Sequence, residues 1–506
     1  MQYLLAALPI VVLLGLMMAL RWGGQRAGPA GWLVGLAVAA LAFGLNWDVL
    51  WVSQLKGLFL SLFVLAILWP ALLLYNVVDQ VGGIRALARG LEAAIGDRGL
   101  LLVVLAWAFS ALLEGLAGFG LPIAIVAPML VALGVAPVTA VAAVAVGHAW
   151  SVTFGDMGVI FQTLVGLTGM AGARLAPPAA FLLGIACLLC GLATGRLLGQ
   201  GRRWPVVVLL GLLMSGAQYG LAVTGLTPLA GLGAGLAGVL AALGLGKATA
   251  QPAAMATANP SASSPALTST LISYGALGAL LAAIALIRPL YDILYPVVWQ
   301  MRFPSVTTAT GFSTPAGMGQ ALRPLVHPGS AILLTAIGTF LVQRYLGHLA
   351  PGQWRSVLRA TWRSAGPTSL GIVSMVGLST LMDHCGMTLL LAQALSAAMG
   401  SLFPLVSPLV GILGAFATGS NNNSNVLFAS LQQGAAHLLA IDPRLLLAAQ
   451  TAGGSLGSML APAKIIVGCS TVDARGQEGD VLRRTAAYGL GIGFAIGAVV
   501  LLLARS

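Results

Sequence analysis

A polar run within apolar sequence is the feature that most constrains this chain. Residues 418–425, TGSNNNSN, are all Thr, Gly, Ser or Asn, yet they stand between the apolar segments LFPLVSPLVGILG and VLFASLQQGAAHLLAI. Such a cluster ordinarily forms a solvated surface loop. Within a membrane, backbone of this kind persists only where it lines a cavity or is buried in protein. The stretch Gly414–Asn425 is therefore the first candidate for a binding site.

The surrounding sequence is typical of a protein that crosses the bilayer many times. Of the 506 residues, 59% are hydrophobic and only 7% are charged, whereas a soluble domain carries about 25% charged residues. The net charge of +12 could suggest nucleic acid. However, the basic residues fall in short clusters between apolar segments, which is the positive-inside pattern. We therefore expect an all-α integral membrane protein whose surroundings are the lipid bilayer and not nucleic acid.

The apolar segments predict about 12 to 14 transmembrane helices together with short re-entrant pieces. Residues 2–20 form the first span. Because Arg21 and Arg26 follow this span, we expect the N-terminus to lie outside. No basic segment precedes the span, so we interpret it as a retained helix rather than a signal peptide.

A segment rich in Pro, Ala, Ser and Thr, 246–267, is the predicted linker between the halves of the chain. It separates an N-terminal transmembrane half, 1–245, from a C-terminal transmembrane half, 268–506. Residues 290–327 are too polar for a span and too apolar for disorder, and their structure does not follow from the sequence.

Two interrupted regions, near 109–166 and 415–471, repeat one another at the offset of 306 residues that separates Pro137 from Pro443. Each contains a helix, a polar glycine-rich tip, an apolar return, a proline, a second helix and a glycine-rich break followed by a charge. The same offset places Glu114 on Ser420. Paired interruptions of this kind are typical of transporter binding sites. We therefore predict two inverted repeats with re-entrant hairpins and broken helices around one site.

The candidate substrate-binding residues are the polar and small residues of the hairpin tips and helix breaks. Amide and hydroxyl groups, with the free N–H groups of helix N-termini, can hold a carboxylate. Their oxygens could equally hold Na⁺, and close helix packing through small polar residues is the structural alternative. Three consecutive asparagines pack poorly, which favours binding. The set comprises Gly118, Phe119, Gly120, Thr418, Ser420, Asn421, Asn422, Asn423, Ser424, Asn425, Gly453, Gly454, Ser455 and Lys464.

Three ionisable residues, Glu114, Asp156 and His148, are candidates for proton coupling. An ionised side chain at the bilayer centre costs roughly 2.5–3.5 kcal/mol or more, so such residues are functional candidates by default. Each also has a structural alternative. Glu114 could accept bonds from the amides of its own hairpin, Asp156 could form an ion pair with Lys464, and His148 could simply be hydrogen-bonded within its helix break.

Four blocks of this sequence carry a resemblance to a known family. They are LEGLAGFGLPIAIVAPMLVALGVAP, GAFATGSNNNSNVLFASLQQGAAHLLAID, AGGSLGSMLAP and GQEGDVLRRT. The blocks cover both interrupted regions, and in this order they resemble the signature segments of the bacterial L-lactate permease family, which also contains glycolate permeases. The resemblance implies a secondary transporter that imports 2-hydroxymonocarboxylates with protons. More loosely, it implies the paired-hairpin architecture of the ion-transporter superfamily and an elevator-like motion.

The resemblance also implies a multi-pass protein of the bacterial cytoplasmic (inner) membrane. Its expected partners are a small organic anion and a proton, with Na⁺ as the alternative ion and a homodimer as an open arrangement. No cofactor and no metal are expected. The chain departs from the family pattern at Gly147-His148, Asp156, Asn421–Asn423 and Lys464. A Na⁺-coupled or exchanging transporter of another organic anion therefore stays open as the alternative function.

An enzyme is not expected from this sequence. The metal-site spacing H-E-x-x-H is absent, and the four cysteines (Cys187, Cys190, Cys385 and Cys469) lie in or beside apolar segments, where they are ordinary packing residues. A channel is a further alternative, although broken helices with dispersed ionisable residues favour alternating access.

Overall fold

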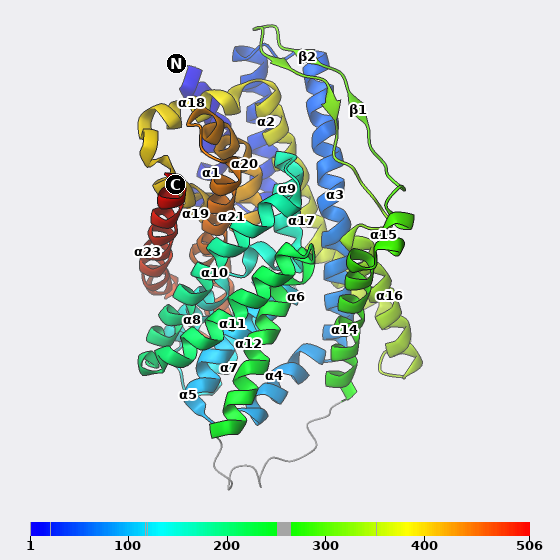
Figure 1. The fold of residues 1–506 in the computed structure, drawn as a ribbon, viewed down its shortest axis with the longest axis vertical. Helices are drawn as coiled ribbons and strands as arrows, with labels where there is room; N and C mark the ends of the chain where they lie inside the picture. Colours follow the sequence, from blue (N-terminus) through cyan, green and yellow to red (C-terminus); the bar gives the residue numbers. More distant parts are fainter. Residues whose placement is uncertain are drawn as a thin grey trace.

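The protein is an elongated bundle of long apolar helices, as a computed structural model shows (Figure 1). The structure describes residues 2–20, 22–116, 118, 120–249, 265–350 and 352–505. Within these residues, 11 helices are long and apolar enough to cross a membrane. Three shorter apolar helices accompany them: Leu121–Ala132, Pro137–Ala149 and Asp156–Thr168. The predicted all-α membrane fold is confirmed.

The helices of the N-terminal half begin with a hairpin and the long helix α3, which contains Pro70, and then enter the first interrupted region. The transition from α5 to α6 is a π-helical turn, Leu105–Phe109. The elements are α1 (Gln2–Ala19), α2 (Gly24–Ala42), α3 (Trp47–Gln80), α4 (Gly83–Ala94), α5 (Arg98–Val104), α6 (Ser110–Leu116), α7 (Leu121–Ala132), α8 (Pro137–Ala149), α9 (Val159–Thr168), α10 (Gly172–Leu197), α11 (Trp204–Val223) and α12 (Thr227–Thr249).

The C-terminal half contains the second interrupted region and the only strands of the described chain. The strands are β1 (Arg302–Phe303), β2 (Val306–Thr307), β3 (Ser313–Thr314) and β4 (Gly317–Met318). The helices are α14 (Pro265–Leu286), α15 (Arg288–Leu294), α16 (Pro328–Tyr345), α17 (Gln353–His384), α18 (Met387–Met399), α19 (Phe403–Thr418), α20 (Asn421–Leu438), α21 (Pro443–Gly457), α22 (Pro462–Thr471) and α23 (Glu478–Leu503).

The element bounds repeat along the chain at the offset seen in the sequence. Helices α8 and α21 both begin at the aligned prolines, and each is followed by a 3-10 turn, at Val152–Phe154 and Ser458–Leu460. The 26-residue helices α10 and α23 begin and end 306 residues apart. In Figure 1, α5 and α7 lie in the lower part of the bundle, whereas α18 and α20 lie in the upper part. The two hairpins therefore enter the bundle from opposite ends.

The offset of 306 residues does not hold at the hairpin tips, so one pairing predicted from the sequence is wrong there. Helix α7 has 12 residues and begins at Leu121, whereas α20 has 18 residues and begins at Asn421. The second return helix is therefore extended toward its tip. As a result, Glu114 lies inside α6 while Ser420 caps the start of α20, so the two residues are not structural equivalents.

The segment that the sequence could not place forms an extended ribbon along the outside of α3 (Figure 1). Strand β1 pairs with β4 and strand β2 pairs with β3, both antiparallel. The Asn46 side chain, which caps α3, also donates to the Thr307 carbonyl oxygen and so ties the ribbon to the bundle. Of the predicted linker, residues 250–264 lie outside the described residues, while α12 continues to Thr249 and α14 begins at Pro265.

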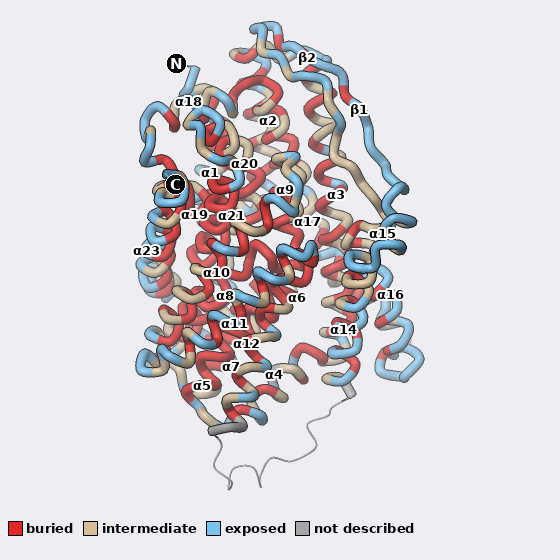
Figure 2. Tube along the Cα trace, viewed as in Figure 1, coloured by how far each residue is buried: buried red, intermediate tan, exposed pale blue. Residues whose placement is uncertain are grey.

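The interrupted regions form the buried centre of the bundle (Figure 2). The span Arg98–Leu116 is 100% buried within the protein, whereas the outer span Ala266–Leu286 is 22% buried. Close helix contacts at this centre depend on two aligned glycines. A Cβ atom on Gly147 would lie 1.9 Å from the Ala106 carbonyl oxygen, and one on Gly453 would lie 1.9 Å from the Pro408 carbonyl oxygen. Each repeat thus uses a glycine at the same position to bring its broken helix against its hairpin.

We predict that Gly147→Ala and Gly453→Ala each destabilise the protein, because backbone atoms must move to admit the new methyl group. Overpacking of this kind costs about 1–3 kcal/mol, which should lower the unfolding midpoint of the purified protein by several degrees. Gly216→Ala in α11 is the matched control, since its Cβ would meet nothing within 4 Å. Its unfolding midpoint should stay the same or rise slightly. Equal midpoints for Gly453→Ala and the control would contradict this packing.

Candidate functional site

The hairpin tips and helix breaks of both repeats meet at one cavity of about 300 Å³. Its wall on the other side is formed by the start of α2, by Leu68 of α3 and by α17. The repeats contribute Glu114, Val152, Asp156, Val159, Ile160, Gly419, Ser420, Asn421, Asn422, Asn423 and Lys464, and the wall contributes Gly23, Gly24, Gln25, Leu68, Pro367, Thr368, Gly371 and Ile372. The site therefore lies where the repeats face the rest of the protein.

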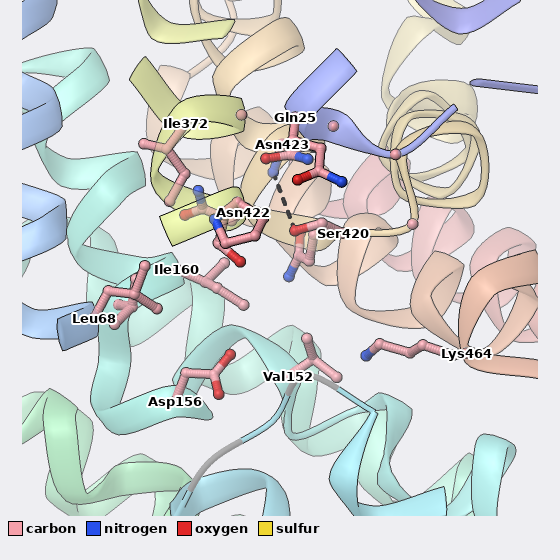
Figure 3. A pocket seen from close by; sticks show the side chains of 18 of the residues that line it. Gln25, Leu68, Val152, Asp156, Ile160, Ile372, Ser420, Asn422, Asn423 and Lys464 are labelled. Carbon is pink, nitrogen blue, oxygen red and sulfur yellow. Dashed lines mark hydrogen bonds between the residues drawn. The ribbon is translucent and has the colours of Figure 1, made fainter. Parts of the chain in front are cut away.

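The N-terminus of α20 points its polar residues into this cavity. The Ser420 side chain caps the helix by accepting from the Asn423 backbone N–H at 3.5 Å (Figure 3). Asn422 is 6% exposed, and neither its amide nitrogen nor its amide oxygen has a hydrogen-bond partner in the described chain. Free backbone N–H groups and the helix dipole favour an anion at such a terminus. The Asn422 carboxamide adds one donor and one acceptor for a ligand that carries both.

Lys464 and Asp156 face the cavity from different sides (Figure 3). Lys464 lies in the first turn of α22 and Asp156 at the break before α9. No ion pair joins these two residues, so the cavity separates a cation from a carboxylate instead of containing a closed salt bridge. An anionic ligand could take the place of the missing partner of Lys464.

Two carboxyl groups and one imidazole cluster around Gly118. A Cβ atom on Gly118 would lie 2.6 Å from Glu114 Oε1 and 2.7 Å from Asp156 Oδ1, so only glycine leaves room for both carboxyl groups. The Gly118 backbone N–H donates to Asp156 Oδ1. Neither Glu114 oxygen has a hydrogen-bond partner in the described chain, although Glu114 is 1% exposed.

The imidazole of His148 faces Glu114 in a defined tautomer. His148 Nδ1 lies 2.6 Å from the Val144 carbonyl oxygen, and because a carbonyl only accepts, Nδ1 carries a proton. In the neutral ring Nε2 is then an acceptor, and it lies 4.0 Å from Glu114 Oε2. Two buried acceptors that face each other disfavour the state in which neither Glu114 nor His148 Nε2 carries a proton. The geometry therefore suits one proton shared between these two groups.

The backbone at Asp156 adopts a conformation that is rare for residues other than glycine. Asp156 has φ +48° and Met157 has φ +54°. Each such residue costs of order 1–3 kcal/mol and persists only where its surroundings hold it. Here the turn Asp156–Gly158 separates α9 from α8 and aims the carboxylate at Gly118. The predicted break at Gly155-Asp156 is therefore present and positions an ionisable side chain.

A buried hydrogen-bond network joins the two helix breaks. The Thr153 hydroxyl donates to the Thr451 carbonyl oxygen at 3.0 Å and accepts from Asn421 Nδ2 at 3.0 Å. The Thr153 backbone N–H donates to Ser455 Oγ at 3.0 Å. Asn425 Nδ2 donates to the Thr451 hydroxyl, also at 3.0 Å. A single threonine of the first repeat thus satisfies polar groups of the second.

The structure divides the residues predicted to bind substrate into two groups. Ser420, Asn421, Asn422, Asn423 and Lys464 line the cavity together with Glu114 and Asp156. The others lie behind it. Thr418 donates within its helix to the Gly414 carbonyl oxygen, Ser424 donates to that of Gly411, and Asn425 and Ser455 belong to the network at Thr153. Gly118, Gly453 and Gly454 provide close approach, Gly120 has a positive φ of +82° before α7, and Phe119 lies outside the described residues.

Sequence reasoning missed several residues of the site. Gln25 and Thr368 line the cavity from α2 and α17, and nothing in their local sequence marks them because the fold alone brings them there. Thr153 was also missed, although it stands in the interrupted segment SVTFG, where a buried hydroxyl could have been sought.

Among the residues that the structure describes, neither a cysteine nor a histidine lines this cavity. No group of three or more His, Cys, Asp or Glu side chains that could hold a metal occurs in the described part of the chain. Gly453–Gly457 has the G-x-S-x-G spacing of a hydrolase elbow. The Ser455 hydroxyl is nevertheless fully buried and accepts from Thr153, with no histidine among its partners in the described residues.

These features define a class: a multi-pass membrane protein of two repeats, whose hairpins and broken helices enclose a charged polar cavity. The sequence model of the L-lactate permease family matches residues 2–505. The chain is 26% identical to the L-lactate permease of Bacillus subtilis (strain 168), over 96% of this chain and 93% of that protein. It is also 26% identical to the glycolate permease of Escherichia coli (strain K12), over 99% of this chain and 95% of that protein.

Among solved structures, the Neisseria gonorrhoeae protein MtrF, described with a class of antimetabolite efflux pumps, matches with a TM-score of 0.47 at 15% identity. That match covers 86% of this chain and 80% of MtrF. The family match spans nearly the whole sequence, so the chain belongs to the L-lactate permease family. It is therefore a multi-pass bacterial membrane transporter.

We predict that Thr153→Val loosens the junction between the repeats. The substitution removes the hydroxyl that accepts from Asn421 and donates to the Thr451 carbonyl oxygen, which leaves these groups only the longer 3.3 Å bond to each other. Loss of buried hydrogen bonds of this kind costs about 1–3 kcal/mol. Thermal unfolding of the purified protein should begin several degrees lower. Thr163→Val is the matched control, because this equally buried hydroxyl donates only to the Val159 carbonyl oxygen of its own helix. A Thr153→Val variant as stable as the control would contradict the junction.

Proposed function

We propose that this protein is a secondary active transporter of small 2-hydroxymonocarboxylates such as L-lactate or glycolate, coupled to protons. The observation that carries the proposal is the cavity itself. It places an unpaired lysine, the N-terminus of α20 and the unpartnered Asn422 carboxamide around a space of about 300 Å³. This volume is at the lower end of the range found for ligand pockets. Membership of the permease family supports the same substrate class.

The chemistry of a 2-hydroxymonocarboxylate fits these groups one by one. Its carboxylate would pair with the Lys464 ammonium and with N–H groups at the start of α20. Its hydroxyl, which both donates and accepts, would meet the Asn422 carboxamide, which offers the complementary donor and acceptor. A site that hydrogen-bonds a hydroxyl rejects analogues that lack it, because its own polar groups would be left unpaired.

The charge balance of the cavity supports proton coupling. With both carboxyl groups ionised, Glu114 and Asp156 outnumber Lys464, and a bound monocarboxylate would add a second uncompensated negative charge. One proton on the Glu114–Asp156–His148 cluster offsets that charge, and the facing acceptors of Glu114 and His148 are where it would reside. Binding of the anion and binding of the proton would thus favour each other.

We also propose alternating access of the elevator type, with the N-terminus outside the cell. In this account the hairpins and broken helices move as a unit past the wall formed by α2, α3 and α17. The cavity at this boundary supports such a division. Spin labels on α3 and α20 whose separation is the same with and without L-lactate would contradict the motion.

Uptake into proteoliposomes tests the proposed function directly. With an alkaline interior, wild-type protein should accumulate labelled L-lactate, and replacing external Na⁺ with choline should change nothing. Lys464→Met should abolish both net uptake and lactate–lactate exchange, because the substrate loses its counter-charge. Glu114→Gln should abolish net uptake and retain exchange, because substrate still binds but no proton is carried.

The matched control is Arg475→Gln, an exposed charge that does not line the cavity, which should transport normally. Normal net uptake by Glu114→Gln would overturn the proton assignment. Uptake that requires Na⁺, or that occurs only as exchange in wild-type protein, would favour the alternative of a Na⁺-coupled or exchanging transporter of another organic anion.

A further inference from the structure

A second cavity of about 580 Å³ lies on the outer side of α3 and α17, away from the substrate cavity. Its walls are mostly apolar and include Trp69 and Leu73 of α3, Leu333 of α16, and Leu358 and Trp362 of α17. Leu333 is 40% exposed and Trp362 is 66% exposed, so the rim is open on the side of the bundle. Figure 1 shows α16 at the edge of the bundle.

One histidine at this cavity has a buried ring nitrogen without a hydrogen-bond partner in the described chain. His327 lines the cavity, is 4% exposed, and packs edge-on against the Phe63 ring at 4.7 Å between centroids. Its Nδ1 accepts the Gly329 backbone N–H at 3.3 Å, so in the neutral ring Nε2 carries the hydrogen. That Nε2–H has no partner among the described residues. The mostly apolar wall therefore holds a buried hydrogen-bond donor without a partner, near the Ser330 hydroxyl that lines the same cavity.

A row of positive charge runs beside the rim. Arg355, Arg359 and Arg363 of α17 are exposed and are spaced four residues apart, which places them on one face of the helix. The cavity residues Leu358 and Trp362 form the neighbouring stripe of the same helix. Arg355 packs over the Trp354 ring at 5.3 Å, and none of the three arginines forms an ion pair with a described residue.

We propose that this site binds an anionic phospholipid of the surrounding bilayer. One acyl chain fills the cavity, an ester carbonyl oxygen accepts from His327 Nε2, and the phosphate lies on the arginine row. Apolar walls, an unpartnered imidazole N–H and an adjacent row of unpaired arginines match the three parts of such a lipid, and basic sites beside transmembrane helices are typical headgroup sites. A zwitterionic lipid would gain little from the arginines.

The lipid site adjoins α3 and α17, the helices that also form part of the wall of the substrate cavity, so a bound lipid affects that wall. Leu68 lines the substrate cavity, while its neighbour Trp69 lines the lipid cavity. The two helices between the cavities are joined by Trp69 to Ser369 at 3.0 Å and by Asn76 to Thr361 at 3.1 Å. A bound lipid packs against both helices from outside and stabilises the wall. Lipid binding at this site does not depend on which substrate the first cavity takes.

Lipid binding to the purified, delipidated full-length protein tests the proposal. Dioleoylphosphatidylglycerol and dioleoylphosphatidylcholine are added in separate arms, with native mass spectrometry and thermal unfolding as readouts. We expect phosphatidylglycerol to stay bound and to raise the unfolding midpoint, and phosphatidylcholine to do neither. The triple variant R355Q/R359Q/R363Q should lose at least half of that rise. Ser330→Phe, which places a ring in the cavity, should lose the bound lipid.

The control variant R202Q/R475Q/R505Q removes the same charge from exposed positions elsewhere and should respond as wild type. Equal stabilisation by the two lipids would overturn the headgroup assignment. Equal responses of the two triple variants would overturn the arginine row, and retention of phosphatidylglycerol by a folded Ser330→Phe variant would overturn the cavity.

Discussion

The structure depends on how it satisfies polar backbone at membrane depth. Each repeat breaks a helix in the buried centre of the bundle, and a break exposes N–H and C=O groups that lipid cannot satisfy. Thr153 solves this for both repeats at once, since its hydroxyl and N–H contact Thr451, Ser455 and Asn421. The junction fixes the two breaks against each other. Because of it, Asp156 and Lys464 can face one space without forming a closed ion pair.

The same arrangement supports the proposal that the cavity takes an anion together with a proton. A buried charge is stable only when it is paired or neutralised, and here two carboxyl groups share the cavity with one lysine. Gly118 lets both carboxyl groups approach the same point. Because the two groups are close, protonation of one affects protonation of the other. The Asn-rich start of α20 supplies neutral donors and acceptors that recognise a small ligand without adding charge. We propose that transport uses this balance.

Much of the fold could be predicted from the sequence, because the patterns that indicate helices and repeats can be read along the chain itself. Apolar runs of spanning length predicted the helices, and the offset of 306 residues predicted the repeat that the bounds of α10 and α23 show. Asp156 and Lys464 could be brought to one site because each follows a break in its own repeat. The two side chains lie across the cavity from each other and do not form an ion pair. This arrangement depends on side-chain positions that no sequence pattern encodes.

Other features required three-dimensional contacts. Helical phase decided the roles of the asparagines: Asn422 faces the cavity, whereas Asn425 turns toward α21. The six extra residues of α20 at its tip shifted the repeat alignment there. The wall residues Gln25 and Thr368 carry no local signal at all, and the ribbon at 302–318 consists of strands too short to have a hydrophobic period.

We propose that the cavity binds a small 2-hydroxymonocarboxylate, and ligand-dependent thermal stability tests this binding, since a ligand that binds only the folded protein stabilises it. L-Lactate, glycolate, propionate and succinate are compared on purified wild-type protein and on Asn422→Leu. We expect saturable stabilisation by L-lactate and glycolate, a much weaker effect of propionate, which lacks the hydroxyl, and none of succinate. Asn422→Leu should lose the preference for the hydroxy acids. Stabilisation by succinate alone, or an unchanged preference in Asn422→Leu, would contradict it.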